Sequence, residues 1–129
     1  MLVVDASVVA PVVADGGLDG IHYRRRLRGE GLAAPDLLRV EVLSVIRAQL
    51  GNRALDTKQA DHAVDDLIDL PIAVYPTVSL LPRTWELRDN LTAYDACYVA
   101  LAEALGCTLL TADVRLSRAP GTRCSIELV

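Results

Sequence analysis

The chain has 129 residues, a length that fits one domain and leaves no room for two. Hydrophobic residues make up 52% and charged residues 23%, which predicts a folded protein with an apolar core and excludes a disordered chain. There is no Phe, and 17 acidic residues outnumber 13 basic ones, so the net charge is −4. This composition argues against a basic nucleic-acid coat protein and against a module that stacks single strands on aromatic side chains.

The chain is expected to be cytoplasmic and to lack contact with membranes. No segment reaches the roughly 20 apolar residues that cross a bilayer. The apolar start of the chain has no basic residues before it and is interrupted by Asp5, which is not typical of a signal peptide. The three cysteines show no paired C-x-x-C spacing, so neither a disulfide framework nor a zinc site is predicted.

The first half of the chain is predicted to contain two strands and three helices. Residues 1–5, MLVVD, form an apolar run that ends in a charge, as in a buried parallel strand. Pro11 stands inside the helix that follows, and Gly51 ends the last helix of this half. In chain order the elements are a strand over 1–5, helices over 6–14 and 18–28, a short strand over 32–35 and a helix over 36–50.

The second half repeats the alternation of helices and strands. Asp56 and Gln59 have the spacing of a capping box, Thr92 is suited to cap a later helix, and Gly106 is suited to end it. The elements are helices over 56–70, 79–89 and 92–105, strands over 72–75 and 107–111, a helical turn after Asp113 and an edge strand over 124–128. We therefore predict a single α/β domain with a central parallel sheet of four to five strands between helices.

Four acidic residues are placed where that fold puts ligand sites. Asp5 ends the first strand and Asp113 follows the 107–111 strand, and sites in parallel sheets lie beyond the carboxyl ends of strands. Glu41 lies on the apolar stripe of its helix, and Asp95 lies in a helix with only one other charged residue, Glu103. Clustered carboxylates need a counter-charge, and hard divalent cations prefer carboxylate oxygens, so a divalent cation is predicted.

Each acid also has a structural alternative. Asp5 and Asp113 are suited to cap the helices that follow them, and Asp95 has capping-box spacing with Thr92. Glu41 could form a buried ion pair with Arg39 or Arg47.

Three segments resemble the PIN-domain ribonucleases, and within them the VapC toxins of bacterial toxin–antitoxin pairs. They are VVDASV at the start, APDLLRVEVL in the middle and LTAYDACYVALAEALGCTLLTADVRL near the end. The resemblance covers essentially the whole chain. It implies an endoribonuclease that depends on Mg²⁺ or Mn²⁺, with Asp5, Glu41, Asp95 and Asp113 as the acidic ligands.

The resemblance also implies supporting residues and partners. Ser7 and Thr111 match the small hydroxyl residues beside the site, where they orient the carboxylates by hydrogen bonds. Asp5 and Asp95 would bind or bridge the metal, Asp113 would bind it directly or through water, and Glu41 would bind it or accept a proton from water. The implied partners are an RNA substrate, a second copy of the chain in a homodimer, and a small VapB-like antitoxin with a basic side chain directed at the acidic site.

Basic residues offer further contacts with RNA or a partner. Arg115, two residues after Asp113, could reach a substrate phosphate, and the arginines of residues 24–28 form a basic face; both could equally be solvated side chains. Where many relatives carry a further acid or Asn after the last aspartate, this chain continues with Arg115, Leu116 and Ser117, which puts a fifth acidic ligand in doubt. Trp85 is expected to serve packing or a subunit interface.

Other functions are weaker alternatives. A haloacid-dehalogenase-like phosphatase needs a second aspartate where Ser7 stands, and a phospho-receiver domain needs an acidic pair and a late lysine, whereas Lys58 is the only lysine. A catalytically silent PIN-like scaffold and a housekeeping RNA-processing nuclease stay open. The four intact acids favour an enzyme over a scaffold.

Overall fold

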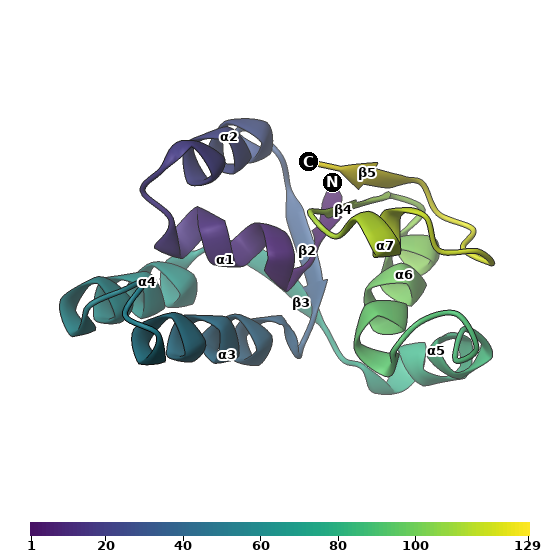
Figure 1. Cartoon of the computed structure of the whole chain (residues 1–129). Helices are drawn as coiled ribbons and strands as arrows, with labels where there is room; N and C mark the ends of the chain where they lie inside the picture. Colours follow the sequence, from purple (N-terminus) through teal and green to yellow (C-terminus); the bar gives the residue numbers. More distant parts are fainter.

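A five-stranded sheet lies at the centre of the computed structural model, which describes residues 1–129 (Figure 1). Its strands are β1 (Leu2–Val4), β2 (Leu32–Pro35), β3 (Ile72–Tyr75), β4 (Thr108–Thr111) and β5 (Ile126–Leu128). Every neighbouring pair is parallel, in the order β3-β2-β1-β4-β5. The carboxyl ends of all five strands therefore lie along one edge, and the predicted α/β class with a parallel sheet is confirmed.

Helices cover both faces of this sheet, with α1 to α4 gathered on one side and α5 and α6 on the other (Figure 1). They are α1 (Ala6–Ala14), α2 (Leu18–Leu27), α3 (Leu38–Gly51), α4 (Thr57–Asp69), α5 (Leu81–Glu86), α6 (Ala93–Leu105) and α7 (Val114–Ser117), with a 3₁₀ turn η1 (Val78–Leu80) before α5. Helices are required at the faces because both sides of a parallel sheet are apolar.

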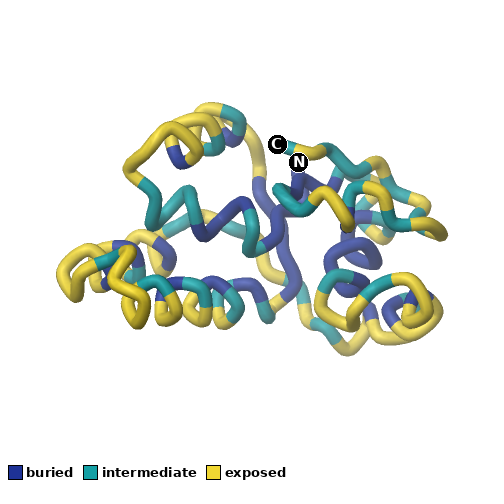
Figure 2. Tube along the Cα trace, viewed as in Figure 1, coloured by how far each residue is buried: buried dark blue, intermediate teal, exposed yellow.

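The core is aliphatic and is densest around β1, β4 and α6 (Figure 2). Strands β1 and β2 are buried along their whole length, and α6 has seven consecutive buried residues, Ala96–Ala102. An apolar surface on all sides of a helix requires burial on all sides, which explains why α6 lies against the middle of the sheet. No helix combines the length and the apolar composition that crossing a membrane requires.

Most predicted boundaries agree with the structure to within two residues, and the differences have local causes. The helix predicted from Asp36 begins at Leu38, because the Asp36 N–H donates to the Tyr75 carbonyl oxygen at 2.9 Å and continues the pairing of β2 with β3. The single helix predicted over 79–89 is instead η1 followed by α5, with Pro82 in the first turn of α5, where a missing N–H costs no helical bond.

Two arginine–glutamate pairs join outer elements of the fold. Arg26 on α2 donates from Nε and Nη2 to the two carboxylate oxygens of Glu127 on β5, at 2.7 and 2.9 Å. Arg83 on α5 makes the same kind of double contact with Glu103 on α6, at 2.8 and 3.2 Å. The backbone N–H of Arg123 adds a third bond to Glu103, at 2.7 Å. Paired geometry of this kind is the strong form of a charged hydrogen bond.

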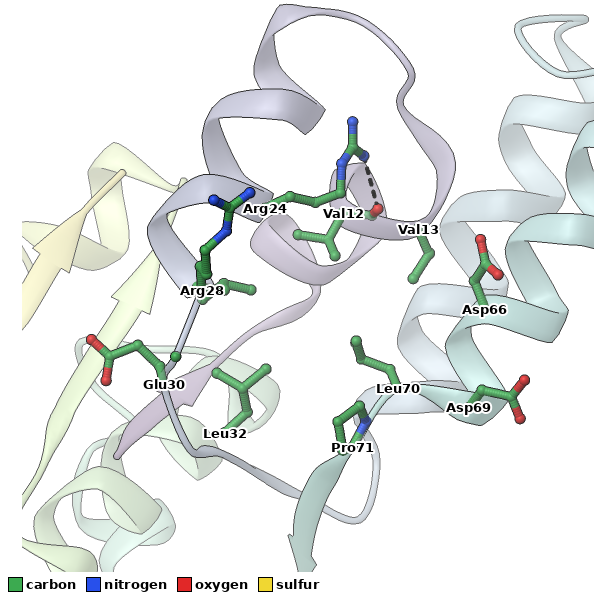
Figure 3. A pocket seen from close by; sticks show the side chains of 12 residues that line it. Val12, Val13, Arg24, Arg28, Glu30, Leu32, Asp66, Asp69, Leu70 and Pro71 are labelled. Carbon is green, nitrogen blue, oxygen red and sulfur yellow. Dashed lines mark hydrogen bonds between the residues drawn. The ribbon is translucent and has the colours of Figure 1, made fainter.

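A hollow of about 570 Å³ lies between α1, α2 and α4 (Figure 3). Leu32 and Pro71, near the starts of β2 and β3, line its floor, so it belongs to the edge opposite the carboxyl ends of the strands. Arg24 lines this hollow and donates to the carbonyl oxygens of Val12 and Asp15 at 3.0 and 2.9 Å. With Arg26 paired to Glu127, two of the arginines that were predicted as a basic face are already bound within the chain.

Candidate active site

Two neighbouring strands bring Asp5 and Thr111 into contact. Asp5 follows β1 and Thr111 ends β4, and the parallel register pairs Val4 with Leu110 directly before them. The Thr111 hydroxyl donates to Oδ2 of Asp5 at 2.5 Å, although the two residues are 106 positions apart. Asp5 is only 5% exposed. The sheet, and not the local sequence, therefore builds this part of the site.

Ser7 completes a small hydroxyl network around Asp5. Its hydroxyl donates to Oδ1 of Asp5 at 2.5 Å and accepts the Ala112 N–H at 2.8 Å. The Asp113 N–H in turn donates to the Thr111 hydroxyl at 3.1 Å. Both predicted hydroxyl residues thus hold the Asp5 carboxylate in place, and backbone groups of the β4–α7 connection hold the hydroxyls.

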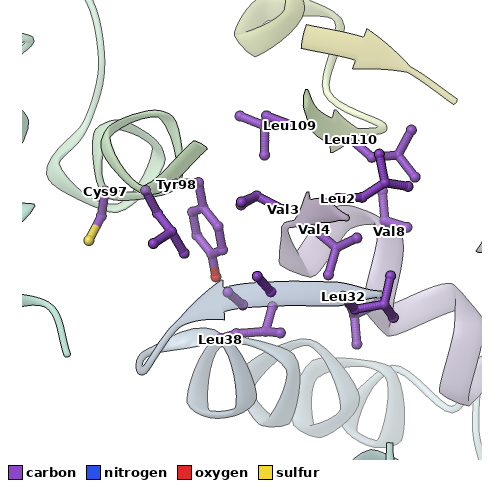
Figure 4. Packing of buried hydrophobic residues seen from close by; sticks show 14 of the residues in the cluster. Leu2, Val3, Val4, Val8, Leu32, Leu38, Cys97, Tyr98, Leu109 and Leu110 are labelled. Atoms are coloured by element: carbon purple, nitrogen blue, oxygen red, sulfur yellow. The ribbon is translucent and has the colours of Figure 1, made fainter. Parts of the chain in front are cut away.

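Glu41 enters the same region from the first turn of α3. It is half-buried, and Oε1 accepts a 2.6 Å hydrogen bond from the Tyr98 hydroxyl. Figure 4 shows the Tyr98 ring reaching from α6 with its hydroxyl toward β2 and α3. Glu41 takes part in none of the four ion pairs of the structure, so the alternative of an arginine partner is wrong. Arg39 instead donates to the carbonyl oxygens of Leu67 and Leu70 at the end of α4.

The contact between Tyr98 and Glu41 was not predicted from the sequence. A signal for it was present, because Tyr98 stands among aliphatic residues of a helix that must be buried, and a buried tyrosine hydroxyl needs a hydrogen-bond partner. The sequence could not name the partner, since Glu41 is 57 positions away.

Asp95 lies in the first turn of α6 and is half-buried. Its backbone N–H donates to the Thr92 hydroxyl at 3.2 Å, so Thr92 caps the helix as predicted. An aspartate in the first turn is favoured by the partial positive charge of the helix N-terminus. The cap explains why the helix begins here, and it leaves the Asp95 carboxylate without an ion pair.

The structural alternatives for Asp5 and Asp113 are also present. Asp5 caps α1 by accepting the Val8 N–H at 3.3 Å, and Asp113 caps α7 by accepting the N–H groups of Arg115 and Leu116 at 2.9 and 3.4 Å. Capping does not exclude ligation, because a carboxylate has about four lone-pair positions and a cap occupies one or two. The caps fix where these two carboxylates stand.

The carboxylates disfavour one another's charge. Burial raises the pKa of Asp5, Glu41 and Asp95 above their ordinary values. The charge of Asp95 raises the pKa of Asp5 and of Glu41 further, and the charge of Asp113 does the same to Asp95. Arg115 is exposed, and its positive charge acts against these effects by lowering the pKa of Asp95. The predicted acids thus lie near enough to repel one another, and Arg115 lies beside them.

The donor set fits a hard divalent cation in its chemistry. It consists of carboxylates, and none of them is neutralised by an arginine or lysine ion pair. The side chains are not yet arranged as ligands: no group of three or more His, Cys, Asp or Glu residues converges as a metal site would. Glu41 is turned toward Tyr98, and Asp113 toward the N-terminus of α7. The backbone already places the acids on one edge, and Oε2 of Glu41 and Oδ2 of Asp113 make no hydrogen bond, so these side chains can turn toward a cation while their other oxygens keep their contacts.

The family follows from sequence comparison. A PIN domain model matches residues 2–121. The VapC ribonuclease Mb0985 of Mycobacterium bovis is 40% identical over 129 residues, which cover all of this chain and 98% of that protein. The chain belongs to the VapC ribonucleases of the PIN-domain family.

Solved structures of VapC proteins share the fold. VapC20 of Mycobacterium tuberculosis, described as a toxin that cleaves the sarcin-ricin loop, has a TM-score of 0.71 at 17% identity and covers 95% of this chain and 97% of its own. VapBC2 of Rickettsia felis, bound to a DNA fragment from its promoter, has a TM-score of 0.69 at 13% identity and covers 98% and 97%. At these identities the likeness concerns the fold of this VapC chain alone.

Proposed function

We propose that this VapC chain is an endoribonuclease that acts as the toxin of a toxin–antitoxin pair. It hydrolyses RNA phosphodiester bonds with Mg²⁺ or Mn²⁺ held among Asp5, Glu41, Asp95 and Asp113. The observation that carries the proposal is a set of four carboxylates at the carboxyl edge of the sheet, none of which has an ion-pair partner. Burial and the charges of neighbouring acids raise the pKa of three of them, Asp5, Glu41 and Asp95. Such a set is costly in a folded protein unless a cation completes it.

The four acids are proposed to have different roles in binding the metal. Asp5 is the most rigid ligand, because both of its oxygens are held by hydroxyls and it is nearly fully buried. Asp95 and Asp113 enter from a helix start and a strand end, and Glu41 either joins them or accepts a proton from water. When bound, one or two divalent ions supply charge neutralisation at the phosphoryl oxygens, activation of water and stabilisation of the leaving alkoxide.

Arg115 is proposed to contact the substrate. Its side chain is exposed beside the acids, and its charge is felt at Asp95. An arginine in that position can bind a phosphate oxygen of RNA while the acids face the scissile bond.

A small antitoxin and a second copy of the chain are the proposed protein partners. A neutralising antitoxin would direct a basic side chain at the acidic edge, where it would supply the missing positive charge. The homodimer is supported by apolar side chains left exposed on α3 and α5, such as Val40 and Trp85. Trp85 is 68% exposed, so of its two predicted roles a subunit interface suits it better than core packing. Light scattering that shows a strict monomer at high concentration would remove the dimer.

The direct test uses the purified chain, free of antitoxin, with total cellular RNA and Mg²⁺ or Mn²⁺. Cleavage is expected with metal, none with a chelator, and none with Asp95→Asn, which keeps the size of the side chain and removes its charge. Asp66→Asn is the matched control, because Asp66 is an exposed acid on α4 that belongs to no part of the site. A folded chain that neither binds metal nor cleaves RNA would contradict the proposal and favour a silent scaffold.

A further inference from the structure

One buried side chain links the two helices that carry site carboxylates. Tyr98 lies on α6, one turn after Asp95, and its side chain is 1% exposed. Its hydroxyl points toward β2 and α3 (Figure 4). There it donates to Oε1 of Glu41 at 2.6 Å. This is the only hydrogen bond that the Glu41 carboxylate makes in the structure. The fold itself gives no reason for a phenol here, since every other large side chain that is as fully buried is aliphatic.

We propose that Tyr98 is a positioning residue for Glu41 and thereby for the divalent cation; this inference rests on the proposed function. Tyr98 holds Oε1, and Oε2, which makes no hydrogen bond in the structure, is left for the cation. It acts through Glu41 and touches neither substrate nor cation.

The need for such an anchor follows from the surroundings of Glu41. A glutamate has three rotatable side-chain bonds and loses more freedom on ordering than an aspartate. The charges of Asp5 and Asp95 repel Glu41, which lies in the first turn of α3 and is only half-buried. Without a donor, the carboxylate would turn toward solvent and away from the site. A hydrogen bond to a charged acceptor is strong enough to oppose that rotation.

The position of Tyr98 on α6 gives the contact a second consequence. The same rigid helix carries Asp95 in its first turn and Tyr98 in its next. Seven consecutive buried residues of α6, Ala96–Ala102, fix that helix against the sheet. The distance between Asp95 and the anchored oxygen of Glu41 is thus set by a packed helix and does not depend on a flexible loop. Ligands supported in this way are pre-organised for binding.

The test measures Mn²⁺ affinity by calorimetric titration of the purified chain, with RNA cleavage as a second readout. Tyr98→Phe removes only the hydroxyl and keeps the ring in the core. We expect Mn²⁺ to bind roughly 10- to 100-fold more weakly, the usual loss when a support of a metal ligand is removed. The matched control is Tyr23→Phe, because Tyr23 lies on α2 near Asp15 and Asp19 and away from the four acids, and the Mn²⁺ affinity of this variant should equal that of the wild type.

A third and a fourth variant separate positioning from a general loosening of the fold. Glu41→Ala should weaken Mn²⁺ binding by itself. When Tyr98→Phe is added to Glu41→Ala, no further loss is expected, because the hydroxyl then has nothing to position. An equal additional loss in that double variant would show that Tyr98 acts through packing and would overturn the inference.

The outcomes distinguish this inference from the function on which it rests. A wild-type chain that binds no Mn²⁺ would overturn the proposed function. Mn²⁺ binding that Glu41→Ala weakens and Tyr98→Phe leaves unchanged would keep the proposed function and overturn the role of Tyr98 alone.

Discussion

The carboxylates of this chain fall into two regions with opposite electrostatics. Away from the site, Glu103 and Glu127 are each held by an arginine, Arg83 and Arg26, and these contacts lower their pKa despite some burial. At the carboxyl edge of the sheet, the pKa of each shifted acid is raised. The chain is rich in arginine and uses it to neutralise acids elsewhere. We therefore propose that a cation from outside the chain binds the acids at the carboxyl edge of the sheet.

The largest expected effect comes from neutralising one acid at the edge. Asp5→Asn should reduce RNA cleavage by about 100-fold or more, because several kcal/mol of charge stabilisation would come from the cation that Asp5 is proposed to bind. Glu127→Gln removes a carboxylate from the paired region and should leave the cleavage rate unchanged. Rates of cleavage of one RNA by the two variants, at equal folded concentration, provide the comparison. Equal losses in both would abolish the distinction between the two regions.

Removing a paired acid should instead lower stability. Glu103 is only 12% exposed and accepts bonds from Arg83 and from the Arg123 N–H. Glu103→Gln is expected to reduce the free energy of unfolding by about 1–3 kcal/mol, the cost of weakening a charged hydrogen-bond group. Urea unfolding followed by circular dichroism measures it. Cleavage by the folded variant should persist, and its loss would place Glu103 in the active site.

The two regions should also respond oppositely to pH in the presence of a chelator. The pKa of Asp95 is raised above its ordinary 3.8 in the folded state, so ionising Asp95 costs more free energy in the folded chain than in the unfolded chain. The stability associated with protonated Asp95 is complete below that pH and is lost as the pH rises. Asp95→Asn should thus stabilise the metal-free chain increasingly from about pH 4 to pH 7, by less than about 1 kcal/mol because the group is partly solvated. Mg²⁺ should remove this gain.

For Glu103 the sign is reversed. Its pKa is lowered from 4.5, so the stability it contributes is present above that pH and is lost as the pH falls through the lowered value. The destabilisation caused by Glu103→Gln should therefore shrink below pH 4.5. Thermal melts of both variants and of the wild type across pH 3–8 test these two predictions. If the stability differences of the two variants from the wild type changed with pH in the same direction, the account would be contradicted.

The smallest effect is expected at the pair between α2 and β5. Arg26 and Glu127 are both partly exposed, so Arg26→Ala should cost about 1 kcal/mol or less. Raising the salt concentration should reduce the difference from the wild type, because exposed pairs are screened. A loss of several kcal/mol would contradict the interpretation of this contact as a screened surface pair.

The strands and helices were predictable from the sequence, whereas the contacts within the candidate site were not. Apolar runs that end at Asp5 and Thr111 gave the strands and the edge, and the apolar surroundings of Asp95 gave a buried helix. Local patterns of this kind depend on neighbours along the chain. The hydrogen bond from Thr111 to Asp5 depends on the register between β1 and β4, which no local pattern encodes.

Contacts between distant elements account for most of what the sequence did not show. Arg39 was an apparent partner for Glu41 because the two are close in sequence, yet it is held by carbonyl oxygens at the end of α4. The hydrogen-bond partner of Glu41 is Tyr98, and the packing of α6 against the sheet brings the Tyr98 hydroxyl within reach of Glu41. A helical turn limits which residues can meet locally, but tertiary packing decides which of them do.

The most direct test of the central claim is diffraction from a crystal soaked in Mn²⁺, with data collected for anomalous scattering. The account predicts an anomalous peak within bonding distance of Asp5 and Asp95, with Glu41 and Asp113 turned toward it. A peak found only among the exposed acids of α4, with none at the carboxyl edge of the sheet, would contradict the account.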